Sequence, residues 1–292
     1  MAKKKSNRGW LYGGIVVVIV AIVAGAHFLG TKKAANANQN KVTTIHVAGV
    51  AAGRPYTYAK GDKLGGYEGE LFDKIDKALP QYKFKYSAVS QNSAFIGLQS
   101  GKYDVSASGY WTNKDRLKTY IQSDPDALAD LRLVYRTNEP KITGFQDIVE
   151  KKLKLAPISS DDARYNIVED YNKANPKEQI DLKAIGDQTA GDALKQIQDK
   201  QYDAVFYPYC AYYAVKIAGG AKGLTTSPSL GLKNCHFYYH KSIQNEKLNK
   251  AVNKELAKLK KDGTLEKLSK KWLGENVYKL PNAQKTWDDA KN

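Results

Sequence analysis

The side chains that most often carry catalysis are few in this 292-residue chain. Four of them are histidines: His27, His46, His236 and His240. Their spacing fits neither a zinc site nor a nucleophile with its base. The adjacent carboxylates Asp161 and Asp162 are more typical of a helix N-cap than of an acid and base couple. We therefore expect a protein that is not an enzyme and that binds no metal or other cofactor.

Cys210 and Cys235 are the only two cysteines. A location outside the cell would permit a disulfide between them, and closing this loop would stabilise the fold by about 3 kcal/mol. Burial as two separate thiols fits the sequence equally well. Two cysteines are too few for a disulfide framework. The stability of the fold must therefore come from its apolar core, for which 42% hydrophobic residues are sufficient.

Positive charge is in excess, with 46 Lys and Arg against 30 Asp and Glu and a net charge of +16. Six basic residues flank one apolar stretch: Lys3, Lys4, Lys5, Arg8, Lys32 and Lys33. The other 40 basic and 30 acidic residues leave a net charge of +10 on the rest of the chain. This charge favours binding to anionic surfaces such as lipid or cell wall but does not determine a fold. Since no stripe of Lys and Arg is clustered outside the last helices, we expect no nucleic-acid binding.

The N-terminus has the pattern of a membrane-targeting segment. Residues 1–8 are basic, and Gly13–Leu29 is apolar except for His27. This length lies between the apolar part of a signal peptide, about 7–15 residues, and a spanning helix of about 17–25. Ala35–Ala37 forms an A-x-A cleavage pattern, so the segment is either cleaved near Ala37 or kept as an anchor. The N-terminal lysines predict a cytoplasmic start, with the body on the extracellular face of the cell membrane.

The remainder alternates between the spacings of strands and helices. Strand-like runs are Thr43–Val50, Phe84–Val89 and Asp104–Ser108, and helical runs are Tyr67–Leu79 and Ala94–Gln99. This alternation predicts an α/β sheet.

An internal echo favours two similar lobes. Residues 98–105 resemble residues 197–205, and each stretch has the pattern of a helix end, a tight turn and a buried strand. Leu131–Tyr135 and His236–His240 suit two strands that cross between the lobes. The chain ends in helices with a lysine-rich face.

These patterns predict four regions. An N-terminal segment of residues 1–33 is followed by a linker of residues 34–41. A discontinuous lobe 1 contains residues 42–135 and 237–292, and lobe 2 contains residues 136–236.

Four segments carry motifs that recur together in one family. They are Leu64–Leu71, Gly109–Pro125, Gln201–Val205 and Asn253–Gly274. In this order they resemble the type 2 periplasmic-binding-protein family, and within it the polar-amino-acid binding proteins of ABC transporters, bacterial extracellular solute-binding protein family 3. The resemblance covers about residues 42 to 275. Glu70 stands where this family usually has Asp.

The resemblance implies two Rossmann-like lobes joined by two hinge strands, which close over a small polar ligand and present it to a membrane permease. The ligand would be an amino acid or a related carboxylate, and the binding protein a monomer. Arg116 would fork onto the ligand carboxylate, because a planar guanidinium suits that geometry. Gly109 opens the same motif.

The resemblance also places aromatic and anion-binding groups around the ligand. Tyr67 and either Tyr56 or Tyr58 would line the lobe 1 side. Ser160 and Asp161 would stand at a helix start in lobe 2, where free backbone N–H groups favour an anion. An ordinary N-cap explains these two residues equally well.

Two departures from the family pattern bear on the ligand. Trp111 replaces a Thr or Ser, and Tyr207 lies where an Asp would hold the ligand ammonium. Either Asp161 or Asp162 replaces that Asp, or the ligand has no free amine, because an unpaired buried ammonium is costly. Trp111 and Tyr207 would then offer ring faces to a cation or a flat group.

Two other functions stay open at this point. The excess charge and the tether suit a surface adhesin or wall-associated protein. A dehydratase-like enzyme could also use the same scaffold, because a fold does not fix a function.

Overall fold

The computed structural model describes residues 42–112, 114–160, 162–186 and 188–290. It divides into a small unit, of which residues 42–43 and 80–83 are described, and a large unit of residues 44–79 and 84–290. In the small unit, the Thr43 N–H donates to the Gln81 carbonyl at 3.0 Å. The predicted N-terminal segment and linker lie outside the described residues. No helix within the described ranges is long and apolar enough to cross a membrane.

The main sheet has eight strands. They are β1 (Thr43–Val50), β4 (Tyr82–Val89), β5 (Val105–Trp111), β6 (Ile121–Gln122), β7 (Ala127–Arg136), β10 (Ala204–Pro208), β11 (Leu224–Thr226) and β12 (Gly231–Tyr239). The order is β10-β7-β12-β5-β1-β4, with β11 on β7 and β6 on β12. Two short sheets add β2 (Tyr58–Lys60) with β3 (Lys63–Gly65), and β8 (Ile158–Ser159) with β9 (Ala184–Ile185).

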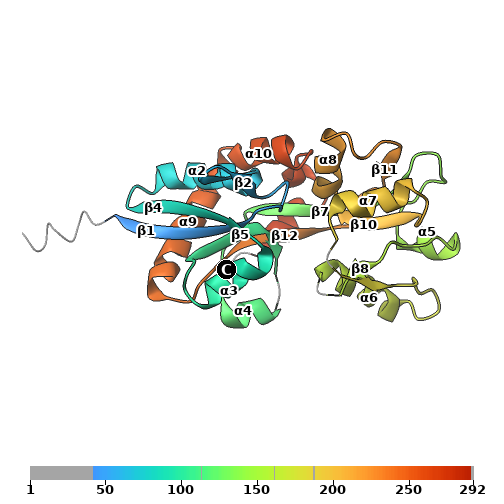
Figure 1. Cartoon of the computed structure of the whole chain (residues 1–292), viewed down its shortest axis with the longest axis horizontal. Coiled ribbons are helices and arrows are strands. Elements are labelled where there is room, and N and C mark those ends of the chain that lie inside the picture. The colour runs from blue at the N-terminus through green and yellow to red at the C-terminus, as the bar shows by residue number, and fades with distance from the viewer. Residues whose placement is uncertain (1–41, 113, 161, 187, 291–292) are drawn as a thin grey trace, which may run out of the picture. The chain divides into compact units, whose positions relative to one another are not determined.

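Helices cover both faces of these strands. They are α2 (Tyr67–Ala78), α3 (Gln91–Gln99), α4 (Lys114–Thr119), α5 (Phe145–Glu150), α6 (Ala163–Ala174), α7 (Ala190–Gln198), α8 (Tyr209–Ile217), α9 (Ile243–Lys261), α10 (Thr264–Trp272), the 3₁₀ helix η1 (Val277–Lys279) and α11 (Ala283–Asp288). In Figure 1, α2 and α10 lie above β1, β4 and β5, whereas α3 and α4 lie below them. This layering confirms the predicted α/β class.

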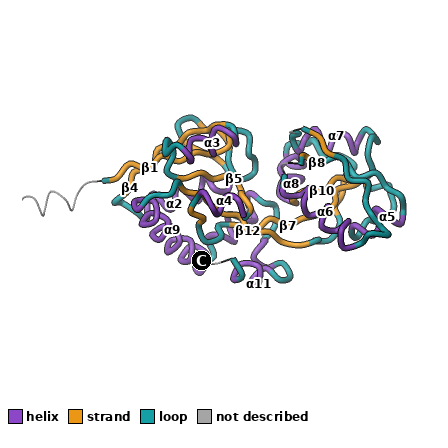
Figure 2. Tube along the Cα trace, turned by 90° about the horizontal axis from the view of Figure 1, so that it is seen from below, coloured by secondary structure: helices purple, strands orange, loops and turns teal. Residues whose placement is uncertain are grey.

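Strands β7 and β12 connect two groups of strands. They pair with each other in an antiparallel ladder from Gly231 opposite Leu131 to Cys235 opposite Ala127. On its other edge β7 pairs with β10 and β11, and β12 pairs with β5 and β6. Figure 2 shows them as neighbouring strands. β7 contains the predicted run Leu131–Tyr135, and β12 contains the predicted run His236–His240 except for His240.

The internal echo is a real structural repeat. Gly101 and Lys200 occupy equivalent turns, and both have left-handed backbones, with φ of 73° and 59°. Asp104 then uses its own N–H and its carboxylate to bind the backbone of His46. Asp203 makes the same pair of bonds to Lys154. Each aspartate therefore fixes a helix end and the next strand to a neighbouring segment.

Helix α2 has a fully buried face that comes from apolar residues at helical spacing. Leu71, Phe72 and Ile75 are all 0% exposed. The Phe72 ring packs 5.9 Å from Phe84 and 4.8 Å from Phe237, which fixes the helix against β4 and β12.

Gly66 precedes α2 in a conformation that favours glycine. Its φ is 102°, and a Cβ atom there would lie 2.4 Å from the Tyr56 carbonyl oxygen. Since the crowding atom belongs to the backbone, a side chain would require the turn itself to move.

We predict that Gly66→Ala destabilises the fold by about 2 kcal/mol or more, because strain and a backbone clash add. The matched control is Gly61→Ala, since Gly61 has φ of 60° but nothing within 4 Å of the added Cβ. It should cost about 1 kcal/mol. Denaturant midpoints measure both, and equal losses would show that the clash at Gly66 is unimportant.

Candidate functional site

Arg116 lies in α4 against a cluster of aromatic rings. Its guanidinium carbon is 4.3 Å from the ring centre of Phe95, 5.5 Å from Tyr110 and 5.7 Å from Tyr238. These rings also pack on one another, at 5.0 to 6.1 Å between centres. A guanidinium that stacks on rings directs its N–H groups outward in its own plane, which is the geometry for binding a carboxylate. The side chain is half-buried and the rings hold it in place.

Gly109 shapes the end of β5 near Arg116. Its φ is 64°, and a Cβ atom would lie 2.4 Å from the Tyr56 ring. Its N–H donates to Glu68 Oε1 at 2.8 Å. Gly109 therefore provides the turn against which Tyr56 packs, and Glu68 fixes that turn. Sequence reasoning did not identify Glu68, although it directly follows Tyr67 in the first motif.

Tyr67 corrects one expectation. It is 0% exposed, and its hydroxyl lies 2.7 Å from both the Asp126 carbonyl and the Tyr278 hydroxyl. A ring that is buried on all sides with a satisfied hydroxyl belongs to the core, so Tyr67 does not line a ligand site. Its position at the first turn of α2, on the same face as Leu71, explains the burial.

Tyr58 and Trp111 are half-buried, as a ligand wall would be. The Tyr58 ring lies between the Arg54 guanidinium, 3.6 Å from the ring centre, and the Trp272 ring at 6.0 Å. Trp111 ends β5 and packs against the apolar cluster that includes Phe206 of β10. Trp111 thus connects the Arg116 motif with β10, the strand that carries Tyr207.

A second arginine, which the sequence analysis missed, organises the start of α6. Arg164 donates from Nε and Nη2 to Asp162 Oδ2 and from Nη1 to the Phe206 carbonyl at 3.0 Å. Its guanidinium carbon lies 3.7 Å from the Tyr207 ring centre. The sequence contained one signal that could have identified Arg164, namely its position two residues after the capping Asp162. Arg164 therefore connects the start of α6 to the end of β10.

The same contacts show the structural role of Asp162. Asp162 is the N-cap of α6, and its other oxygen accepts the Arg164 N–H at 2.8 Å. Arg164 therefore engages both carboxylate oxygens of Asp162. Ser160 is exposed in the turn before α6. Asp161 lies outside the described residues.

Cys210 and Cys235 are buried free thiols that share one partner. Their sulfur atoms donate to Tyr56 Oη at 3.6 and 3.5 Å. Burial raises the pKa of Cys210 to about 12 and that of Cys235 well above its usual value. Of the two sequence alternatives, the structure contains two separate thiols.

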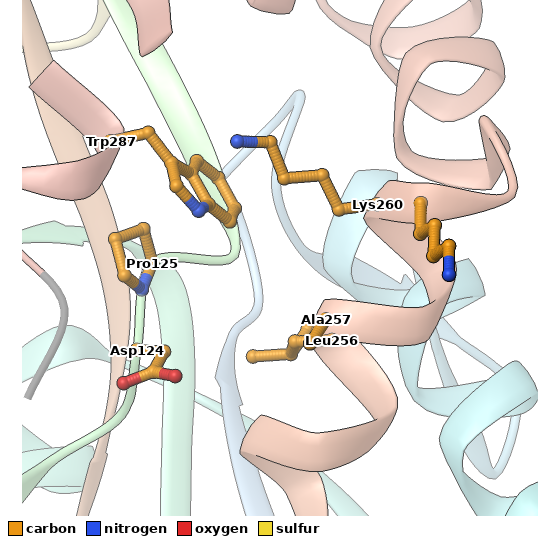
Figure 3. A pocket seen from close by; sticks show the side chains of 7 residues that line it. Asp124, Pro125, Leu256, Ala257, Lys260 and Trp287 are labelled. Carbon is orange, nitrogen blue, oxygen red and sulfur yellow. The ribbon is translucent and has the colours of Figure 1, made fainter. Parts of the chain in front are cut away.

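A cavity of about 310 Å³ lies elsewhere, between α9, α11 and the turn at Asp124 and Pro125. Figure 3 shows Lys260 and Trp287 across it, with the Lys260 Nζ 4.3 Å from the ring centre. None of the residues that line it is a sequence-predicted ligand residue.

We predict that a thiol reagent labels neither cysteine in the native protein, because the thiols are buried and protonated near neutral pH. Unfolding without reductant should release two reactive thiols per chain. Mass spectrometry after alkylation measures this. Labelling that needs reductant even in denaturant would instead identify a disulfide.

Comparison with known proteins connects these features to a family. The model of bacterial extracellular solute-binding proteins, family 3, matches residues 45–275. The L-cystine-binding protein TcyJ of Bacillus subtilis (strain 168) is 30% identical over 222 residues, which are 75% of this chain and 79% of TcyJ. The probable amino-acid-binding protein YxeM of the same strain is 26% identical, over 90% and 95% of the two chains.

Solved structures agree with the family match. The structure from work on glutathione import via GshT and the cystine ABC importer TcyBC of Streptococcus mutans has 29% identity and a TM-score of 0.68. It covers 83% of this chain and 98% of its own. Another, the probable amino-acid ABC transporter binding protein ytmK of Bacillus subtilis, has a TM-score of 0.70 at 24% identity and shows the fold alone. The four-motif resemblance is confirmed, and this chain belongs to the bacterial extracellular solute-binding proteins of family 3.

Proposed function

We propose that this solute-binding protein captures L-cystine, or a closely related disulfide-containing amino acid, for an ABC importer. The observation that carries the proposal is Arg116, held in an aromatic cluster at the family's carboxylate-binding motif. Relatives of the same family support the choice of ligand, since TcyJ and TcyK of Bacillus subtilis are named as L-cystine-binding proteins at 30% and 27% identity. These relatives favour a binding protein over an adhesin or an enzyme.

The proposed site has groups for the carboxylate of L-cystine and for the disulfide at its centre. One ligand carboxylate would accept two parallel N–H bonds from the guanidinium. Trp111 and Tyr207 would contact the disulfide, because sulfur packs favourably against aromatic rings. Tyr207 presents one ring face only, since Arg164 stacks on the other. With Asp162 occupied by Arg164, the ligand ammonium would bind Asp161 or a ring face rather than Asp162.

Delivery would use the two connecting strands. Rotation about β7 and β12 would close the two strand groups over the ligand, and the closed monomer would be the form that the permease recognises. The basic and apolar N-terminal residues support a location on the extracellular face of the cell membrane, either anchored or released after cleavage near Ala37.

Thermal unfolding of the full chain in mild detergent tests the ligand assignment. L-cystine, glutathione disulfide, single amino acids and organic acids would each be added separately. A ligand at about 100 times its dissociation constant adds about 2.7 kcal/mol to stability, so L-cystine should raise the melting temperature clearly. Recovery of unchanged L-cystine would exclude turnover. A shift with other amino acids and none with L-cystine would contradict the ligand class.

We predict that Arg116→Ala weakens L-cystine binding by about 30-fold or more, because removing a charged hydrogen-bonding partner costs about 2–5 kcal/mol. The matched control is Lys118→Ala, which removes an exposed cation from the same helix. Calorimetric titration measures both dissociation constants. An Arg116→Ala protein that is folded and binds as tightly as the control would refute the role of Arg116.

A further inference from the structure

Two carboxyl groups are buried beside the turn that positions Arg116. Glu68 lies in the first turn of α2, Asp126 directly precedes β7, and both are 0% exposed. Their side chains lie close enough to share a hydrogen bond. The Asp126 backbone is fixed at both ends, because its N–H donates to the Cys235 carbonyl at 3.0 Å and its carbonyl accepts from Tyr67. The pair therefore joins α2 to the beginning of a connecting strand.

The hydrogen bonds of this pair are incomplete unless it keeps a proton. Glu68 Oε1 accepts the Gly109 N–H. Glu68 Oε2 and both carboxylate oxygens of Asp126 have no donor among the residues that the structure describes. Two charged carboxylates in contact and out of water repel each other, whereas one shared proton removes the repulsion and supplies the missing donor.

Among the described residues, no positive charge faces the pair to favour ionisation of both groups. The titratable groups that face the pair are the phenols of Tyr67, Tyr110, Tyr239 and Tyr278 and the thiol of Cys235. Burial raises the pKa of each of these groups, so all are neutral near pH 7. Burial also raises the pKa of Asp126 to about 7, and burial together with the charge of Asp126 raises the pKa of Glu68 well above its usual value.

This proton lies one hydrogen bond away from the proposed ligand site. Glu68 accepts the N–H of Gly109, whose left-handed backbone lies two residues before Trp111 in β5, the strand that leads towards the helix of Arg116. Loss of the proton would push Glu68 and Asp126 apart and pull on the turn and on the start of β7. We propose that Glu68 is a positioning residue of the ligand site, which holds the Gly109 turn through a proton shared with Asp126 and so makes ligand affinity fall as pH rises. This inference rests on the proposed function.

The direction of the pH effect follows from the raised pKa. The unfolded chain has carboxyl pKa values of about 4. In the folded pair the pKa of Asp126 is raised to about 7 and that of Glu68 is raised well above its usual value, so the pair loses its last proton only above about pH 7. The folded state thus binds more protons between these values, so its stability is fully present below about pH 4 and falls as pH rises to about 7. Affinity for the ligand should then weaken above about pH 7, by up to about tenfold per pH unit.

The test is calorimetric titration of the full chain in mild detergent with L-cystine between pH 5.5 and 8.5. In Glu68→Gln the amide oxygen still accepts from Gly109 and the amide N–H₂ donates to Asp126, so no proton is needed. The dissociation constant should rise with pH for the native chain and much less for Glu68→Gln. Ionisation of L-cystine affects both proteins equally, so the ratio of their constants isolates the shared proton. Glu255→Gln in α9 is the matched control, because Glu255 is 8% exposed and pairs with Lys258.

Several results would overturn the inference. One is a ratio of the two constants that does not change with pH, and another is a Glu255→Gln profile as flat as that of Glu68→Gln. If Glu68→Gln does not fold, Asp126→Asn replaces it and should flatten the profile in the same way. If neither folds, the dissociation constant of the native chain decides, since a value that does not rise between pH 5.5 and 8.5 contradicts the proposal. Failure of L-cystine to bind at any pH would reject the proposed ligand instead. In that case the melting temperatures of the native chain, Glu68→Gln and Glu255→Gln over the same pH range would still test the pair.

Discussion

The pairing of β7 with β12 is the constraint on which the rest of the structure depends. Each strand forms one ladder with the other and further ladders with different strands, so the two strand groups are connected through this single pair. The beginning of β7 is tied down by Asp126, which bonds to the backbone of β12 and to Tyr67 of α2. A movement of these strands must therefore be transmitted to the α2 side, where Glu68 holds the Gly109 turn. The position of the proposed ligand-binding side chains and the position of β7 and β12 are therefore linked through packing and hydrogen bonds.

The side chains proposed to bind the ligand are each held by several other elements. Arg116 rests on rings from α3, β5 and β12, so its position depends on three elements at once. On the other strand group, Arg164 stacks on the Tyr207 ring and bonds the start of α6 to the Phe206 carbonyl. Both arginines contact ring faces, and Arg164 adds an ion pair and hydrogen bonds. Lys could not replace either residue in stacking on a ring, because its ammonium is not planar. The departures from the family pattern at Trp111 and Tyr207 thus belong to a locally consistent aromatic site.

Local pattern predicted the elements well and the long-range contacts poorly. Thr43–Val50 was predicted as a strand and is β1 without change, because the alternation of apolar residues around Ile45 and Val47 is visible in the sequence. The strand expected at Asp104–Ser108 extends to Trp111, since its outer part pairs with β12 more than 120 residues away. Tyr67 was assigned to the ligand site although helical spacing already placed it on the buried face. The contact of Glu68 with Asp126 and the stacking of Arg164 on Tyr207 join residues 42 or more positions apart, and periodicity carries no information about such partners.

Ligand recognition by Arg116 is tested most directly by comparing L-cystine with its dimethyl ester in calorimetric titrations at one pH. The ester keeps the disulfide and the amines but has no carboxylate for the guanidinium to bind. If Arg116 anchors a carboxylate, the ester should bind about 30-fold more weakly or not at all. Equal affinity for the two compounds would contradict recognition through Arg116 and would leave the aromatic side chains as the determinants of binding.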